Sequence, residues 1–186
     1  MTEAAGAPVE VYGTFSGTID QLALNRIFST GAFVTNAIPR IGRVHLLFQT
    51  SGGLVADGVC LYNYFRTFPA PLTLYNAGSV QSIGTIAFLG AAQRKTSARA
   101  TFMLHRTRAS PQFAQAEALQ QFADGVALDD RRTEAILRHH VALTSAQWAQ
   151  LDRGDLQFSS EEALRIGLAS EIGDFAPPAG TGVFNI

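Results

Sequence analysis

The stretch VHLLFQTSGG, residues 44–53, decides the fold. Its first five residues are almost wholly apolar, which is typical of a strand that is buried on both faces. Polar residues and two glycines end that strand. Apolar side chains then recur at the spacing of one helix face (Val55, Val59, Tyr62 and Phe65). A buried strand that leads directly into a helix predicts a crossover connection to a parallel neighbour.

The same alternation continues on both sides of this stretch. Residues 72–75 and 100–104 predict two further strands, and a helix is expected to begin at Ile83 between them. Residues 10–15 and 168–172 are also strand-like. Because strands and helices alternate with short connections, the sequence predicts an α/β fold with mostly parallel pairing.

The second half of the chain contains one long helical pattern. Helical spacing persists over about 112–143 without a proline. Such a helix exceeds the usual globular length, and we expect it to project toward another subunit rather than pack wholly on its own domain. Ser159 and Glu162 form a capping box that predicts a short helix closed by Gly167. Proline and glycine crowd the end, so we expect one domain over 1–176 and a loose tail over 177–186.

Composition narrows the classes of function. The chain has 186 residues, 47% of them hydrophobic, which suffices for one core and excludes general disorder. The formal charge is −1 and no basic cluster stands out, so neither nucleic acid nor an anionic membrane is an expected partner. No secretory signal and no apolar segment of ~20 residues is found, so we expect a soluble, cytoplasmic protein.

The single cysteine limits redox and metal chemistry. One cysteine excludes an internal disulfide and any multi-cysteine metal site. Cys60 lies in an apolar run between Val59 and Leu61, so we expect it to be a small buried core residue. No metal site is therefore expected.

Two segments carry residues suited to acyl transfer. Gly52 and Gly53 follow a buried strand, where they form either an ordinary turn or one that leaves an amide facing a cavity. Ser82 follows the next strand and opens a helix. Serine there is most often an N-cap, but the helix dipole and free amides can also stabilise an oxyanion at that place. The amides of Gly53 and Ile83 would supply the two donors.

His105 is the candidate base. It ends the strand over 100–104, where a side chain points into the crevice at the carboxyl end of the sheet. His45 lies in a buried strand, and His139 and His140 lie late in the long helix. Structural or solvated roles are simpler for those three.

Four segments occur in an order that points to a family. They are TSGG at 50–53, GSVQSIG at 78–84, TFMLH at 101–105 and the stretch at 155–168 with the capping box. Together they resemble the proteolytic subunit of the Clp proteases, over about 44–172. The resemblance implies an α/β fold similar to that of the crotonases, a right-handed spiral of strand-strand-helix units with a projecting long helix.

The resemblance also implies roles for individual residues. Ser82 would be the nucleophile, His105 the general base and then acid, and Asp155 the group that orients His105. Asp152 is a near competitor of Asp155 in the same polar loop. The amides of Gly53 and Ile83 would form the oxyanion hole. The expected activity is that of a serine endopeptidase acting on peptides or unfolded polypeptides.

Assembly follows from the same resemblance. The resemblance implies assembly into a heptameric ring, single or stacked as a tetradecamer, that encloses a chamber. The partner would be an AAA+ unfoldase, and ATP would enter only through that partner, so no cofactor is expected on this chain. The segment before Val44 matches the family poorly, and this is the region that receives the unfoldase.

The chain departs from the family pattern near the site. Ser51 replaces a proline, Ile83 replaces a methionine, and residues 106–111 lack the family's glycine pair. Two alternatives therefore stay open. One is a catalytically silent ring subunit that pairs with an active paralogue. The other is a crotonase-type acyl-CoA enzyme, although no carboxylate near Gly84 is placed as its acid or base.

Overall fold

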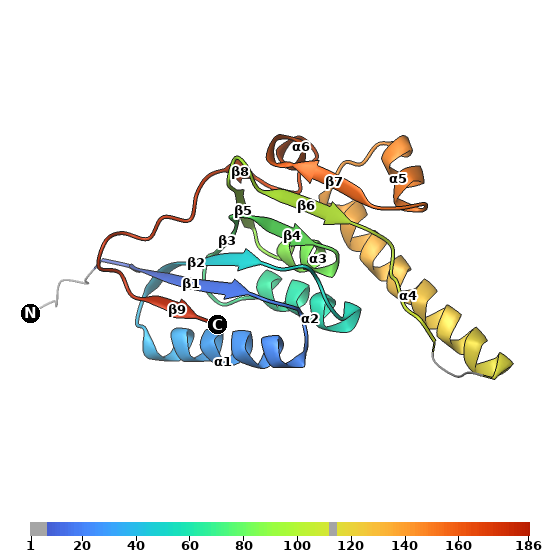
Figure 1. Ribbon diagram of the computed structural model, residues 1–186. Coiled ribbons are helices and arrows are strands. Elements are labelled where there is room, and N and C mark those ends of the chain that lie inside the picture. The colour runs from blue at the N-terminus through green and yellow to red at the C-terminus, as the bar shows by residue number, and fades with distance from the viewer. Residues whose placement is uncertain (1–6, 112–114) are drawn as a thin grey trace, which may run out of the picture.

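The computed structural model describes residues 7–111 and 115–186. Its larger sheet has six strands in the order β8-β5-β3-β2-β1-β9 (Figure 1), and every neighbouring pair is parallel. The strands are β1 (Val9–Ser16), β2 (Ile41–Gln49), β3 (Leu72–Asn76), β5 (Gln93–Thr96), β8 (Glu171–Ile172) and β9 (Val183–Asn185). The predicted α/β class with mostly parallel pairing is confirmed.

A second sheet of three strands lies beside the first. It contains β4 (Ser79–Gln81), β6 (Thr101–Leu104) and β7 (Leu156–Ser159) in the order β4-β6-β7. The pair β4–β6 is parallel, whereas β6–β7 is antiparallel. Along the chain, β3 and β4 lead into α3 (Ile83–Phe88), and β5 and β6 lead toward α4 (Ala116–His140). Each unit thus contributes one strand to each sheet before its helix, as the strand-strand-helix expectation requires.

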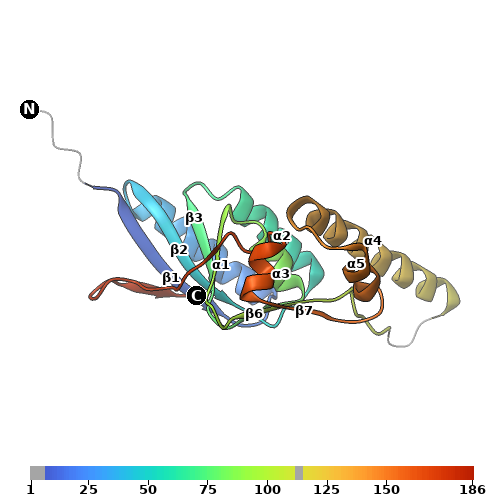
Figure 2. The same cartoon turned by 90° about the horizontal axis from the view of Figure 1, so that it is seen from above.

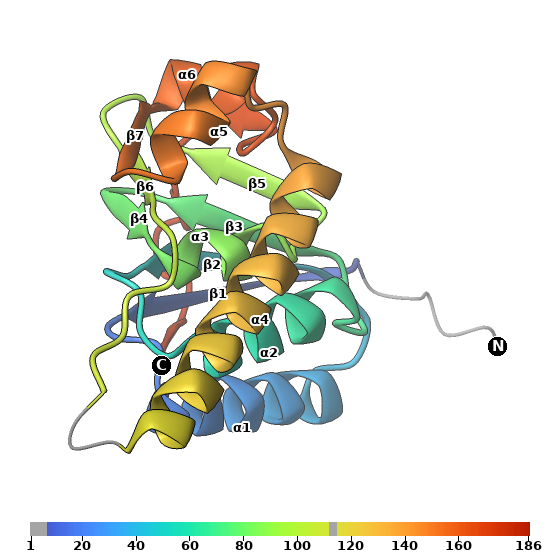
Figure 3. The ribbon, with the colours of Figure 1, turned by 90° about the vertical axis from the view of Figure 1, so that its right-hand side faces the viewer.

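Two helices cover one face of the larger sheet. They are α1 (Gln21–Ala37) and α2 (Val55–Arg66), and Figure 3 shows them side by side against the sheet. The Asp20 side chain caps α1 by accepting from the amide of Ala23 at 2.9 Å. The core that they close is continuous from the larger sheet to the smaller one, with Phe48, Phe88 and Phe102 fully buried.

The predicted long helix is present and projects. In Figures 1 and 2 the first half of α4 extends away from both sheets. Leu137, near the C-terminal end of α4, is buried. The helix ends at His140, short of the predicted 143, because Thr144 caps a separate helix, α5 (Ser145–Leu151), with a capping box. The predicted start at 112 lies outside the described residues. The predicted capping box of Ser159 and Glu162 opens α6 (Ser160–Arg165).

The expected loose tail over 177–186 is wrong at its end. Residues 183–185 form β9, which pairs with the outer edge of β1, and the amide of Ile186 donates to the carbonyl of Thr14 at 2.9 Å. Phe184 packs edge-on against Phe33 of α1. Main-chain bonding to an open strand edge outweighed the proline and glycine signals.

The segment 173–182, which we call the strap, connects the two outer strands of the larger sheet. It runs from β8 to β9 past the sheet, as Figure 1 shows in red. Six strands span about 24 Å, and ten residues reach at most about 36 Å, so the strap is long enough to cross the sheet. Phe175 of the strap packs edge-on against Tyr12 and Tyr75.

Two burial predictions were wrong. Cys60 is exposed, because the buried positions of α2 (Gly58, Leu61, Tyr62 and Phe65) lie on the other face of the helix. In β2, Leu46 and Phe48 are buried whereas His45 and Leu47 are half-buried. The second face of this strand therefore lies against polar groups and the solvent rather than in the core.

Candidate active site

Ser82 lies at the turn from β4 into α3 in an unusual backbone conformation. Its φ is 56° and its ψ is −131°, a region that residues with a side chain rarely adopt. Its amide donates to the carbonyl of Met103 at 2.7 Å, which fixes the turn to β6. The Ser82 side chain makes no capping hydrogen bond, so the N-cap alternative is not what the structure shows.

The glycine turn after β2 packs directly against Ser82. A Cβ atom at Gly52 would lie 2.7 Å from the Cβ of Ser82, and one at Gly53 would lie 2.0 Å from the carbonyl oxygen of Ile19. Neither position accepts a side chain. The Thr50 hydroxyl accepts from the amide of Gly52 at 3.0 Å and holds the turn.

The two proposed oxyanion donors are the amides of Gly53 and Ile83, and they lack main-chain hydrogen bonds for different reasons. The main-chain bonds around Gly53 use the carbonyl of Gly52 and the amide of Leu54, both with Ile19, at 2.8 and 2.9 Å. These bonds do not use the amide of Gly53. Ile83 is the first residue of α3, where an amide has no partner within the helix.

His105 follows β6 and has a defined tautomer. Its Nδ1 lies 2.5 Å from the carbonyl oxygen of Arg106. Because a carbonyl only accepts, Nδ1 carries the proton. In the neutral ring Nε2 is then unprotonated, which is the form that a general base needs.

One pocket brings together four of the five predicted site residues. Gly53, Ser82, Ile83 and His105 all line it. Its other walls are Val55, Ile86, Leu104, Thr107, Arg108, Thr133 and Leu137. Within the described residues, the Ser82 hydroxyl and the His105 ring are not hydrogen-bonded to each other.

The sequence reasoning did not place Thr133 and Leu137 in this pocket. They come from the second half of α4, so the projecting helix also forms part of the pocket wall. The signal in the sequence was weak, because Leu137 belongs to a helical pattern that is mostly polar.

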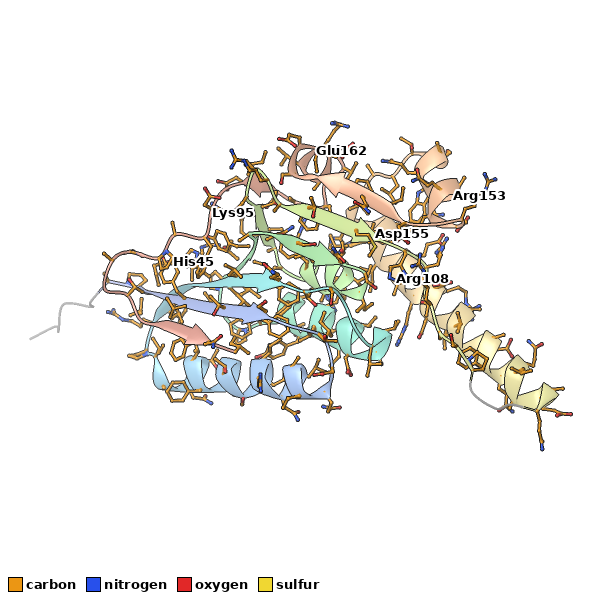
Figure 4. The ribbon with its side chains drawn as sticks, viewed as in Figure 1. His45, Lys95, Arg108, Arg153, Asp155 and Glu162 are labelled. Carbon is orange, nitrogen blue, oxygen red and sulfur yellow. The ribbon has the colours of Figure 1, made fainter. Side chains whose placement is uncertain are left out.

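The fifth predicted residue, Asp155, lies beside the pocket. Its carboxylate is paired with the guanidinium of Arg108, and Figure 4 shows the two side chains next to each other. Asp152, the competitor, accepts from Arg106 at 2.6 and 2.9 Å. Neither aspartate is hydrogen-bonded to His105, whose Nδ1 is bonded to the Arg106 carbonyl.

The strand register nevertheless distinguishes the two aspartates. The β6–β7 ladder ends with Leu104 opposite Leu156, and the next residues on the two strands are His105 and Asp155. Opposite residues of antiparallel strands have Cβ atoms about 5 Å apart. The register continued by one step beyond its last pair would set Asp155, and not Asp152, across from His105.

Arg106 connects the pocket segment to α4 and α5. Its NH1 lies 2.7 Å from Glu134, on the opposite side from Asp152. Burial by itself would lower the pKa of Arg106, but its hydrogen bonds to Asp152 and Glu134 raise that pKa. Burial likewise would raise the pKa of Glu134, and hydrogen bonds from Arg106 and Arg138 lower it. The cluster is thus ionised and holds residues 105–108 in place.

The remaining histidines make structural contacts or face the solvent. His45 bonds to the Tyr75 hydroxyl at 2.7 Å and to Glu10 at 2.6 Å. His140 bonds to the Tyr62 hydroxyl at 3.0 Å, and burial, with the charge of Arg94, lowers its pKa to about 4. His139 is exposed.

Comparison with protein families matches the chain to the Clp proteases over residues 15–175. The chain belongs to the Clp protease family. The match covers the smaller sheet, the pocket, α4 and the larger sheet except β9 and most of β1, and it extends the expected resemblance toward the N-terminus. Family membership supports a peptidase of the Clp kind, and Clp proteases generally assemble into ring oligomers.

Two general features of this Clp family member complete the description. No helix among residues 7–111 and 115–186 is both long and apolar enough to span a membrane. Over the same ranges, no three side chains of His, Cys, Asp or Glu gather as metal ligands would.

Proposed function

We propose that this protein is a serine endopeptidase that cleaves peptides or unfolded polypeptides through an acyl-enzyme. The observation that carries the proposal is the pocket in which Ser82, His105, Gly53 and Ile83 converge. The unusual backbone of Ser82 adds support, because strained conformations persist where the surrounding structure imposes them and are concentrated at functional sites.

The geometry of the pocket supports a defined sequence of steps. The Ser82 hydroxyl attacks the peptide carbonyl carbon, and Nε2 of His105 takes the hydroxyl proton. The amides of Gly53 and Ile83 donate to the oxyanion that forms. His105 then gives its proton to the leaving amine. Water next attacks the acyl carbon while His105 takes a proton from it, and His105 returns that proton to the Ser82 oxygen as the acid is released. Asp155 is the proposed third member, in a state in which it turns toward His105.

The substrate is proposed to bind as an extended strand. Val55, Thr107 and Arg108 line the pocket, and Leu54, which follows Gly53 in the chain, is 61% exposed. Strand addition satisfies the main chain of a peptide without regard to its sequence, which suits an enzyme for unfolded polypeptides.

The proposal includes assembly and partners. The expected assembly is a heptameric ring, single or stacked as a tetradecamer, in the cytoplasm. Exposed apolar side chains on the projecting helix α4, Leu119 and Leu128, support contact with other subunits. The chain would need no cofactor of its own, and ATP would act only through a separate AAA+ unfoldase.

Covalent labelling tests the chemistry. A fluorophosphonate probe should label Ser82, as located by mass spectrometry, and the label should disappear in Ser82→Ala and in His105→Ala. Ser79→Ala is the matched control, because Ser79 lies three residues away on β4 and should leave labelling unchanged. Peptide hydrolysis should fall by a factor of about 10⁴ or more in Ser82→Ala with unchanged unfolding behaviour.

The same experiment separates the alternatives. Absence of label together with acyl-CoA binding would favour a crotonase-type enzyme. Absence of label in a ring that becomes active only with a second paralogue would favour a silent subunit. Native mass spectrometry should show rings, and a stable monomer would contradict the proposed chamber.

A further inference from the structure

Two arginines flank Thr107 at the pocket, and they form ion pairs with different carboxylates. Arg106 is held by Asp152 and Glu134. Arg108 lines the same pocket as Ser82 and is paired with Asp155. The carboxylate of Asp155 is therefore already paired with Arg108 rather than with His105.

His105 is bonded to a main-chain carbonyl rather than to Asp155 in this structure. Its Nδ1–H donates to the carbonyl of Arg106, and the Arg106 side chain is fixed on both sides of its guanidinium. The imidazole is therefore oriented by a neutral acceptor. A neutral acceptor fixes the tautomer, but it stabilises the imidazolium less than a carboxylate does.

We propose that Arg108 positions Asp155, and through it sets the strength of the base at the site. While Arg108 is paired with Asp155, the site works as a pair of Ser82 and His105, and the Arg106 carbonyl orients the His105 ring. When Arg108 releases Asp155, the carboxylate takes over Nδ1 of His105 and completes the triad. This inference rests on the proposed function.

The exposure of the pair makes release easy. The Arg108 side chain is 62% exposed and that of Asp155 is 36% exposed. Exposed ion pairs are weak and are screened by salt. The Arg106–Glu134 pair is better protected, with side chains 25% and 26% exposed, so moderate salt should loosen Arg108 first.

The movement that release requires is small. His105 and Asp155 each follow or precede the last ladder pair of β6 and β7 by one residue, so the movement that we propose is a change of the Asp155 side-chain rotamer. The main chain of Asp155 is held independently, since Gln150 donates to its carbonyl oxygen at 3.3 Å.

The test measures the rate at which a fluorophosphonate labels Ser82, as a function of pH and salt. Arg108→Gln should raise this rate by about threefold to fivefold, the population shift that an exposed ion pair can impose. The acidic midpoint of the pH–rate profile should move upward, because a nearby carboxylate favours the imidazolium. Added salt should accelerate the wild-type protein and leave Arg108→Gln nearly unchanged.

Matched variants identify the cause. Adding Asp155→Asn to Arg108→Gln should abolish the gain and the shift in midpoint. Arg153→Gln should change neither, because Arg153 lies on the outer side of the same loop and points away from the pocket (Figure 4). A gain that persists in the double variant, or no gain in Arg108→Gln while Ser82 is labelled, would overturn the inference and leave the proposed function intact. Absence of Ser82 labelling from every variant would overturn both.

Discussion

At the scale of single residues, Ser82 and Gly52 depend on each other. The hydroxyl of Ser82 reaches the pocket because the backbone turns through a rarely occupied region. That turn places its Cβ where only a hydrogen at Gly52 leaves room. The strand end that supplies Gly53 to the pocket therefore also fixes the conformation of Ser82.

Gly52→Ala should damage the site more than the fold. The added methyl group would meet the Cβ of Ser82 at 2.7 Å, at a residue whose φ is +103°. We expect a loss of about 1–3 kcal/mol in the free energy of unfolding, measured by urea denaturation, and a fall of about tenfold or more in Ser82 labelling. Gly125→Ala on α4 is the control, since its Cβ would meet nothing and should stabilise the helix slightly. Equal labelling of Gly52→Ala and wild type would contradict this account.

His140 should make stability depend on pH. The pKa of His140 is about 4 in the folded protein, below its ordinary value of 6.5, because burial and Arg94 disfavour the charged ring. The unfolded chain therefore binds the proton first as pH falls. Stability should be full above about pH 6.5 and fall toward pH 4, by about 1–2 kcal/mol after allowance for partial exposure.

Urea denaturation at pH 7.5 and pH 5 measures this dependence. In His140→Gln, the fall in stability between these values should shrink, because glutamine can still bond to the Tyr62 hydroxyl but does not titrate in this range. His139→Gln should reduce this dependence less than His140→Gln does, because the charge of His139 lowers the pKa of His140 less than burial and Arg94 do. An unchanged slope in His140→Gln would assign the effect to other groups.

The sequence patterns predicted which residues line the pocket, but they did not predict which charged side chains pair beside it. Gly53, Ser82 and His105 could be placed together because each follows the carboxyl end of a strand, β2, β4 and β6 respectively, and Ile83 follows Ser82. The partners of Asp152 and Asp155 could not be predicted. Arg106 and Arg108 have long side chains, and the choice among neighbouring carboxylates depends on distances that no local pattern encodes. The catalytic roles stay predictions.

At the scale of elements, the sequence predicted the strongly apolar segments and missed the short polar ones. Strands β2, β3 and β6 have continuous apolar runs and were expected. Strands β4 and β5, with the sequences SVQ and QRKT, are three and four residues long, which is too short for a strand pattern to be recognised. Helix α1 carried readable signals in the Asp20 cap and the buried spacing of Ala23, Leu24 and Ile27, but no expectation was drawn from them.

At the scale of the whole molecule, the strap and β9 tie one edge of the larger sheet to the other. Phe184 and Ile186 also close an apolar pocket between the sheet, α1 and α2. The end of the chain therefore contributes to the core and covers the outer edge of β1 at the same time.

Removal of residues 177–186 should destabilise the protein and expose an edge. Loss of the two half-buried apolar side chains should lower the free energy of unfolding by about 2–4 kcal/mol in urea denaturation. The open edge of β1 should cause association that rises with concentration, measured by light scattering against the wild-type assembly. Val183→Ala is the control, because this side chain is 42% exposed. An unchanged urea midpoint in the truncated protein would show that the terminal strand contributes no stability.

The parallel pairing of β1 with β9 also governs how the molecule responds to force. The first and last strands of the chain are neighbours that run in the same direction. Pulling on the two ends would therefore load the hydrogen bonds between them in shear, all at once, rather than peel them apart one by one. A short closing strand can in this way give the subunit a mechanical strength out of proportion to its length.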